Sequence, residues 1–558
     1  MKSRIVIQIT FRGIPNIPIH PSPTFFISNF SPIRLPVAIS SCIYYYYYKL
    51  VLIKNNPLNH VDIFNFPLKM NNYRLSILIA LFILFAGFAG LLNGSESKKV
   101  RKPNIIIFSF DTLRADHLSF YGCDNKTSPA IDAFAKDAVL FTNTISQASF
   151  TAPSHMSLFT SLTPAVHKVN NPNDGDPDIF NCLNEGITTL PMILQQQGYR
   201  TIGMHGGGCV SSEFGFDRGF DSYTNDFFFN FHTPYFQPQR IMPTIQEHVR
   251  KSKETGQPLF LFLHHFLCHH PYIHAPESIQ TSFLKKPVKG LPTSRDDLLK
   301  NKDPGWGVYD EDSFWRDIDL SNPEHKRHVI ALYDGGILYA DTIFQQLLDI
   351  LKEEGCYRDS LIILTSDHGE EFNEHGGNMH GRLFIEQLHV PLIVKFPQDR
   401  YAETIIERPV RIIDIMPTVT DQLGITISQP IQGSSLLPLL SGEKGEPART
   451  IASYALIYKG PDTAEQETAV RLVDNGYVYS NQAWNGQSEW LFDERADPAE
   501  QRNLVGGIPL LAKKMSEQAT ELLRENQAFS EKLSDKETEP GKMNDTLKKQ
   551  LKALGYVQ

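Results

Sequence analysis

Asn104-Ile-Ile-Ile-Phe-Ser-Phe-Asp111 is a short apolar run that ends in a carboxylate. Ser360-Leu-Ile-Ile-Leu-Thr-Ser-Asp367 has the same layout much later in the chain. Continuous apolar runs of this length are typical of strands buried on both faces of a parallel sheet. The same pattern predicts three further strands, at 200–205, 259–264 and 391–396.

Longer amphipathic stretches separate these runs, so strands and helices alternate from about residue 103. The alternation predicts an α/β fold with a large, mostly parallel sheet flanked by helices. Ligands in such sheets bind beyond the carboxyl ends of the strands. Asp111, His264 and Asp367-His368 lie at such ends. We therefore expect these side chains to converge although they are distant in sequence.

The domain organisation follows from length and changes of pattern. A chain of 558 residues is too long for one ordinary core. We expect a catalytic domain at 103–430, a small C-terminal α+β subdomain at 431–507 and a helical tail at 508–558. Four candidate strands predict an antiparallel sheet in the subdomain, at 454–458, 469–473, 477–480 and 490–492.

Composition excludes several classes of protein. With 41% hydrophobic and 21% charged residues, the chain is neither disordered throughout nor mostly embedded in a membrane. Its net charge of −9 disfavours a nucleic-acid partner. The six cysteines form no CxxC pair, so they indicate no zinc-ligand spacing.

The N-terminal segment differs from the rest of the chain. We expect residues 1–69 to be a leader absent from the native product, with Met70 as the true start. Residues 70–92 have the basic start, apolar core and small residues of a signal peptide. The apolar stretch 75–92 approaches the ~20 residues of a membrane span, so an uncleaved anchor is the alternative. Both predict an exported enzyme, whether periplasmic, secreted or anchored facing outside.

Two clusters carry residues suited to catalysis. Asp111, Asp367 and His368 are ligand types that a divalent metal takes while keeping a position open, although an aspartate after a strand can also be a helix N-cap. In the run 149–160, Pro153 predicts a helix start, and a hydroxyl just before it would meet an anionic ester at the positive helix end. A simple N-cap is the alternative for Thr151.

Several ordered motifs resemble the sulfatase family of the alkaline phosphatase superfamily. Residues 104–122 resemble its opening strand and metal aspartate, and Thr151-Ala-Pro-Ser-His155 resembles its nucleophile motif. Further matches are Phe214–Asp221, His269–Tyr272, Ser366–Gly369, Asp414–Thr418, Gln432–Pro438 and Phe492–Gln501. The resemblance spans about 103–504 and implies the large mixed sheet of that family with a smaller C-terminal domain.

The departures from the family pattern concern the mechanism. The family needs Cys or Ser at the nucleophile position because their oxidation yields the aldehyde formylglycine. Thr151 would give a ketone, so we do not expect formylglycine. Thr112 replaces the second metal aspartate, and His155 replaces the arginine of the motif.

The remaining set is similar to the single-metal site of threonine-nucleophile relatives such as lipoteichoic acid synthase-like phosphotransferases. It implies one divalent ion, Ca²⁺, Mn²⁺ or Zn²⁺, bound by Asp111, Thr151, Asp367 and His368. Thr151 would be the nucleophile. His269 and His380 are candidate catalytic residues because imidazole titrates near neutral pH. His155, His375 and Arg114 are candidates to bind the substrate; a structural role is the alternative for each histidine.

Three functions compete. The first is hydrolysis of a sulfate or phosphate ester of a small molecule or glycan; the family favours sulfate, whereas Thr151 favours phosphate or phosphonate. The second is a membrane-anchored transferase of phosphoglycerol or phosphoethanolamine groups. The third is a non-enzymatic binder of sulfated glycans, which retention of the metal set disfavours.

Overall fold

The computed structural model describes residues 101–172, 180–225, 240–299, 314–442, 451–458, 466–533, 541 and 543–553, with four strands before residue 100. The chain divides into two compact units, 1–100 and 101–558. In the first unit, β1 (Arg4–Ile7) pairs antiparallel with β2 (Phe25–Ser28), and β3 (Tyr46–Leu52) with β4 (Asp62–Leu68). The expected signal segment, 70–92, lies outside the described residues. Among the described residues, no helix has the length and apolarity to cross a bilayer.

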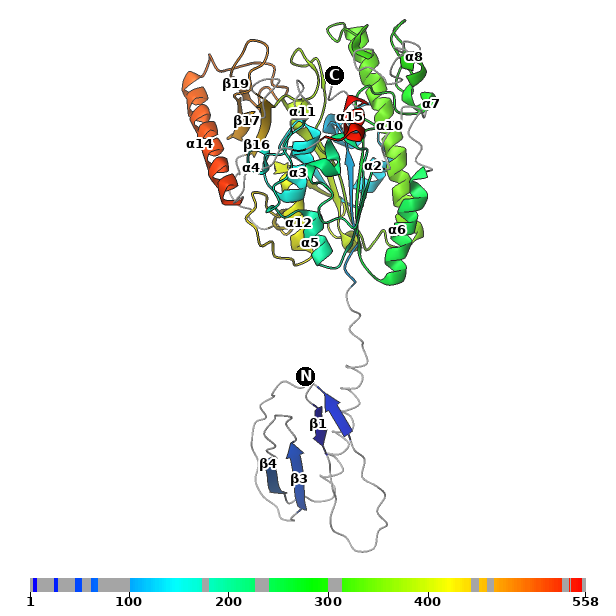
Figure 1. The fold of residues 1–558 in the computed structure, drawn as a ribbon, viewed down its shortest axis with the longest axis vertical. Coiled ribbons are helices and arrows are strands. Elements are labelled where there is room, and N and C mark those ends of the chain that lie inside the picture. Colours follow the sequence, from blue (N-terminus) through cyan, green and yellow to red (C-terminus); the bar gives the residue numbers. More distant parts are fainter. Residues whose placement is uncertain are drawn as a thin grey trace. The chain divides into compact units, whose positions relative to one another are not determined.

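The second unit is organised around a nine-stranded sheet, seen nearly edge-on in Figure 1. The strand order is β14-β6-β13-β10-β5-β9-β7-β8, and β15 also pairs with β6. Only β13 runs against the other strands, so the predicted mixed, mostly parallel sheet is confirmed. The strands are β5 (Ile105–Phe110), β6 (Val139–Ile145), β7 (Arg200–Met204), β8 (Ser222–Thr224), β9 (Leu259–His265), β10 (Leu361–Ser366), β13 (His389–Lys395), β14 (Thr404–Ile406) and β15 (Val410–Arg411).

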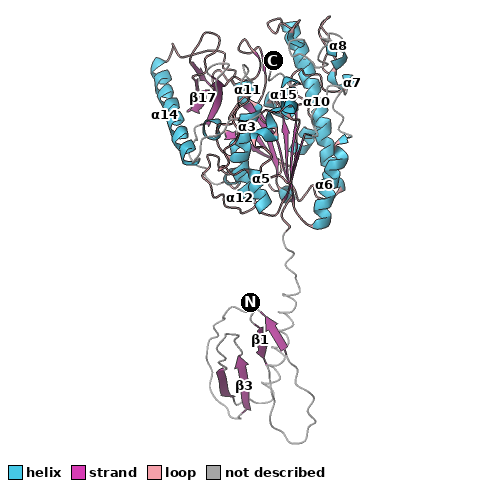
Figure 2. Ribbon diagram, viewed as in Figure 1, coloured by secondary structure: helices cyan, strands magenta, loops and turns pink. Residues whose placement is uncertain are grey.

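Helices cover both faces of the sheet (Figure 2). One face carries α2 (Pro129–Ala135), α6 (Met242–Thr255) and the long α10 (Pro323–Glu353). The other carries α3 (Thr151–Thr160), α5 (Leu190–Gln196) and α12 (Ile415–Gln422). With both faces covered, β5, β9 and β10 are buried along their whole length, which explains the apolar stretch that each has before its polar carboxyl end. The shorter helices are α4 (Pro164–His167), α7 (Glu277–Gln280), α8 (Arg295–Leu299), α11 (Ile385–Leu388) and α13 (Leu437–Leu440).

The register of the central strands sets where the polar residues lie. Phe110 of β5 pairs with Ser366 of β10 on one side and with His265 of β9 on the other. All three strands are parallel, so their carboxyl ends form one edge. Asp111, His265 and Asp367 are therefore neighbours at this edge, and the Asp111 N–H donates to the His265 carbonyl at 3.0 Å.

The C-terminal region forms the predicted antiparallel sheet. Its strands are β16 (Ile451–Tyr458), β17 (Gln466–Asp474), β18 (Tyr477–Ser480) and β19 (Trp490–Asp493), paired in chain order. Helix α14 (Pro509–Leu533) covers this sheet with Met515 and Ala519, whereas α15 (Asp545–Ala553) packs Leu547 and Leu551 into the main core. A buried ion pair between Arg471 and Glu500 (2.5 Å) links the C-terminal sheet to α11, because Glu500 also accepts the Ile385 N–H.

Candidate active site

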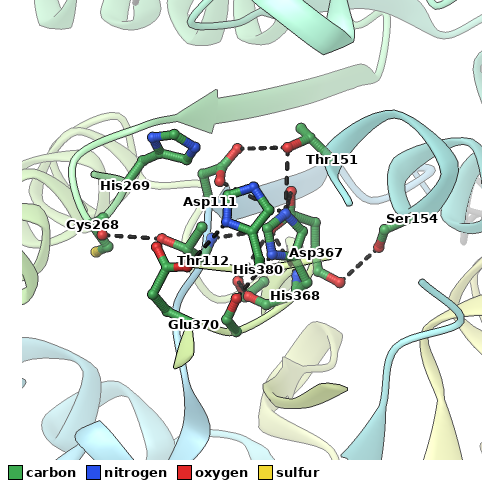
Figure 3. A network of polar contacts seen from close by, with 12 residues as sticks. Asp111, Thr112, Thr151, Ser154, Cys268, His269, Asp367, His368, Glu370 and His380 are labelled. Carbon is green, nitrogen blue, oxygen red and sulfur yellow. Dashed lines mark hydrogen bonds and ion pairs between the residues drawn. The ribbon is translucent and has the colours of Figure 1, made fainter. Parts of the chain in front are cut away.

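Helix α3 begins at the carboxyl edge of the sheet and presents Thr151 there. Phe150 has extended backbone angles, and the helix starts at the next residue. The Thr151 hydroxyl lies 3.3 Å from the Asp111 Oδ2 atom and 3.4 Å from the His368 Nε2 atom (Figure 3). All three side chains are fully buried. The hydroxyl thus lies between a carboxylate and an imidazole at the positive end of a helix.

Asp111, Asp367 and His368 could hold a metal ion together. One potential ligand atom of each lies within 4.8 Å of the others. The Nδ1 atom of His368 is 2.9 Å from the Gly369 carbonyl, which can only accept a hydrogen bond. Nδ1 therefore donates to this carbonyl, and Nε2 is the ring atom that faces the two aspartates, at 3.9 and 3.6 Å, where it could bind a metal ion as its ligand.

The hydrogen bonding of the two aspartates fits a divalent cation. Asp111 Oδ1 and Asp367 Oδ2 are buried, and neither has a hydrogen-bond partner among the described residues. Unpaired buried carboxylate oxygens are costly, and burial raises the pKa of Asp111 to about 7. Two such oxygens beside an imidazole lone pair form a donor set for a small divalent ion.

A second group, His155, His264 and Asp367, has ligand atoms equally close together. However, the two ring nitrogens of His155 already lie 2.9 Å from Ser109 Oγ and 3.0 Å from the Thr151 carbonyl. The group of Asp111, Asp367 and His368 is the better ion site, because Asp111 Oδ1 and Asp367 Oδ2 have no hydrogen bond to give up within the described part of the chain, whereas His155 would have to give up one. His155, expected to bind substrate, is a fully buried residue of α3, and both of its ring nitrogens face Ser109 Oγ and the Thr151 carbonyl.

Thr112 has a different role from the aspartate that the family pattern places there. Its φ of 59° is unusual for a β-branched residue and indicates a constrained position. Its hydroxyl donates to the Cys268 carbonyl at 3.0 Å, and its N–H donates to Asp367 Oδ1 at 3.2 Å. Thr112 thus orients Asp367, one of the candidate metal ligands, through its backbone.

We call Asp111, Asp367 and His368 the candidate metal group. His269 and His380 lie near it, as Figure 3 shows. The ring of His380 is 4.4 Å from that of His368 and 5.3 Å from that of His269, between centroids. Burial lowers the pKa of both His269 and His380. The Nδ1 atom of His380 is 3.0 Å from Glu370 Oε1.

Glu370 was not singled out from the sequence as a site residue. It is fully buried, and burial raises its pKa to about 8. The available signal was its place in the run Asp367-His-Gly-Glu370, but the adjacent Glu371 shares that signal. Burial does not distinguish Glu370 from Glu371, since both are buried. The contact with His380 distinguishes Glu370.

Arg114 and His375 are engaged by other protein groups. Arg114 pairs with Asp116 at 2.8 Å and with Glu374 at 2.9 Å. The ring of His375 stacks on Phe384 at 3.8 Å between centroids, and its Nε2 atom is 3.4 Å from Glu386. These contacts favour a part in holding the loop after His368 rather than direct contact with substrate.

Comparison with protein families gives two matches. The family model "Sulfatase" matches residues 103–425, which is more than half of the chain. The model "N-sulphoglucosamine sulphohydrolase, C-terminal" matches residues 373–528. The motif resemblance seen in the sequence is thereby confirmed.

Individual relatives are distant but extensive. An N-acetylglucosamine-6-O-sulfatase of Bacteroides thetaiotaomicron is 23% identical, covering 77% of this chain and 87% of the relative. A multifunctional alkaline phosphatase superfamily protein of Trinickia caryophylli is 32% identical over a shorter region, 32% of this chain and 37% of the relative.

Solved structures share the fold. The phosphonate monoester hydrolase of Agrobacterium radiobacter is 22% identical, with a TM-score of 0.60 over 76% of this chain and 96% of that chain. An enzyme in complex with its substrate D-glucosamine-2-N,6-O-disulfate is 20% identical, with a TM-score of 0.58 over 77% and 98%.

Proposed function

The chain belongs to the sulfatase family, and on that basis we propose that it is a hydrolase of sulfate or phosphate esters with Thr151 as its nucleophile. The observation that carries the proposal is the place of the Thr151 hydroxyl, 3.3 Å from Asp111 and 3.4 Å from His368 at the start of a helix. The family is metal-dependent, and Asp111, Thr151, Asp367 and His368 are the residues that would hold one divalent ion. Such an ion lowers the pKa of a bound hydroxyl and withdraws charge from the substrate.

The residues of the chain supply the remaining parts of the reaction. The Thr151 oxygen attacks the sulfur or phosphorus atom while its proton leaves towards Asp111, the acceptor of the hydroxyl, and the bond to the alcohol oxygen breaks. The result is a threonyl ester, which water cleaves to release sulfate or phosphate and to return the proton to Thr151. His380 lies beside His368 with Glu370 at its Nδ1 atom, so a proton of the buried Glu370, whose pKa is raised to about 8, can pass through His380 to the departing alcohol, while His269 is placed to bind the anion's oxygens.

The substrate class follows from the relatives and from Thr151. Named relatives act on sulfated sugars, and another relative is a multifunctional phosphatase-superfamily enzyme. A threonine cannot form the formylglycine aldehyde, and direct attack by a hydroxyl is the usual chemistry of phosphoryl transfer. We therefore propose an ester of phosphorus as the preferred substrate, on a glycan or a small alcohol.

Matched substrates test this preference. Purified protein, stripped of metal and then restored with Mn²⁺, Zn²⁺ or Ca²⁺, is assayed on an aryl sulfate and on the phosphate monoester, phosphate diester and phosphonate monoester of the same phenol. We expect at least about a tenfold preference for one phosphorus ester, which corresponds to about 1.4 kcal/mol of transition-state stabilisation. A preference for the sulfate would contradict direct attack by Thr151 as the explanation of the substitution. Turnover that requires an added glycerol or glycan acceptor would indicate a transferase.

We also propose that the enzyme is exported. The support is the sequence of residues 70–92, which has the layout of a signal peptide following Met70. N-terminal analysis of the native protein should find a first residue after this segment, or at Met70 if the segment is retained as an anchor. Peptides from residues 1–69 in the native product would contradict the proposed start.

A further inference from the structure

The residues after His368 form a hairpin that carries His380. It consists of β11 (Glu371–Phe372) and β12 (Asn378–Met379), and His380 follows β12 directly. At its end, Gly381 has a φ of 112°, and a Cβ atom there would lie 2.7 Å from the ring of Phe150. Phe150 precedes Thr151. The backbone at Gly381 therefore packs directly against the start of the nucleophile helix, and its position determines how far His380 lies from Thr151.

A side chain from the C-terminal sheet fixes this backbone. Gln482, in the loop between β18 and β19, accepts the Leu383 N–H at 2.7 Å and donates to the Gly381 carbonyl at 3.1 Å. It is 8% exposed. Its own backbone is held in turn, since its carbonyl accepts the Trp490 indole N–H at 3.0 Å. Gln482 thus holds the backbone of Gly381 and Leu383, and Gly381 is the residue that follows His380.

The same loop contacts the hairpin at a second place. The indole N–H of Trp484 donates to the His375 carbonyl at 2.9 Å, and the guanidinium of Arg382 lies 4.0 Å over the Trp484 ring. The hairpin is therefore fixed on both sides of β12 by one loop of the C-terminal sheet. Asp367 and His368 are held without this loop, because the Thr112 N–H at the end of the neighbouring strand β5 donates to Asp367 and His368 Nδ1 lies 2.9 Å from the Gly369 carbonyl.

We propose that Gln482, in the β18–β19 loop of the C-terminal sheet, is a positioning residue that holds His380 in place for the reaction. This inference rests on the proposed function, in which His380 meets the substrate. A misplacement of about 1 Å in a catalytic group can cost about a hundredfold in rate. The two hydrogen bonds of Gln482 to Gly381 and Leu383 are therefore expected to affect the rate strongly.

The test is a double-mutant cycle. Gln482→Met keeps the length of the side chain and removes both hydrogen bonds, and we expect kcat/KM to fall about tenfold, a fraction of the cost of a full misplacement. In a His380→Ala background the same change should have less than about a twofold effect, because the group that it positions is gone. Metal content should stay at the wild-type level in every variant. Losses that multiply in the double variant would overturn the proposal.

Gln429 offers a matched control. It makes the same pair of bonds to another backbone segment, accepting the Thr188 N–H at 2.8 Å and donating to the Thr188 carbonyl at 3.0 Å, outside the candidate site. Gln429→Met should lower the melting temperature to a similar degree and leave kcat/KM unchanged. If Gln482→Met were as active as Gln429→Met, Gln482 would be structural only. Gln482→Glu keeps the acceptor for Leu383 and gives a smaller loss, which supplies a second variant if the methionine protein fails to fold.

A second readout separates this inference from the proposed function. Inorganic phosphate binding, measured by calorimetry on the metal-loaded protein, should weaken in Gln482→Met, whereas adding Gln482→Met to His380→Ala should weaken it no further. If the wild type cleaves no ester, the proposed function fails while this cycle still decides the role of Gln482. Equal weakening in both backgrounds would overturn the positioning role.

Discussion

Replacing Thr151 by alanine is expected to reduce ester hydrolysis by at least about a thousandfold, because removal of a covalent nucleophile is among the largest single losses that an active site can suffer. The Thr151 hydroxyl is fully buried and lies between Asp111 and His368. Thr151→Ser retains an oxygen at the same place and should retain activity within about tenfold, which is about 1.4 kcal/mol. Single-turnover and steady-state rates on the preferred ester measure both.

Thr160, at the other end of the same helix, supplies the control. It is equally buried, and its hydroxyl donates to the Met156 carbonyl within the helix, away from the metal group. Thr160→Ala should lower stability modestly and leave kcat near the wild-type value. Full activity in Thr151→Ala would exclude attack by this hydroxyl, and equal losses in the two variants would mean that the effect comes from the helix and not from the nucleophile.

The strands that frame the site could be predicted from the sequence for a simple physical reason. Residues 105–108, 259–263 and 361–364 are covered on both faces, so each strand has an unbroken apolar stretch, and polar residues come only at its carboxyl end. The polar residue that ends each run then lies at one edge, because parallel strands share the direction of their carboxyl ends. Convergence of Asp111 and Asp367 follows from these two facts alone.

Other parts of the sheet could not be predicted in this way. The run 391–396 suggested a strand, but an apolar pattern contains no direction, and β13 proves to be antiparallel to both neighbours. Strand β6 was missed because Thr142 and Asn143 interrupt its apolar sequence where it is only half-buried. The partners of these strands are set by packing among segments distant in the chain.

Within the site, residue type predicted the candidate metal group Asp111, Asp367 and His368, whose ligand atoms the structure brings together, but not the surroundings of the histidines. His155 and His375 have the same side chain as His380, yet the first lies against Ser109 and the second stacks on Phe384. Nothing local in the sequence distinguishes them, since each partner is distant or across a turn. Gln482 was beyond sequence reasoning for the same reason, because its bonds join the C-terminal sheet to Gly381 and Leu383.

Loss of one aspartate of the metal group is the second large effect that we expect. In Asp367→Asn the unpaired carboxylate oxygen becomes part of a neutral amide, which is a poorer ligand for a divalent ion. Even outer partners of metal ligands contribute about 10–100-fold to metal affinity, so we expect a loss of at least about 100-fold for this direct ligand. Metal content after gel filtration, and Mn²⁺ or Zn²⁺ titrations followed by calorimetry, measure the change. Activity should fall in parallel and return in part at high metal concentration.

Thermal unfolding provides an independent measure of the same site. A ligand at 100 times its dissociation constant stabilises the native state by about 2.7 kcal/mol, so metal should raise the melting temperature of the wild type and leave that of Asp367→Asn unchanged. Asp341 is the matched control, since it is a buried aspartate whose two oxygens accept the Ala130 and Ile131 N–H groups at the start of α2. Asp341→Asn should lose stability through that helix start and still show the full response to metal. If Asp367→Asn responded as strongly as Asp341→Asn, the ion would bind elsewhere, and the unpaired oxygens of Asp111 and Asp367 would need another explanation.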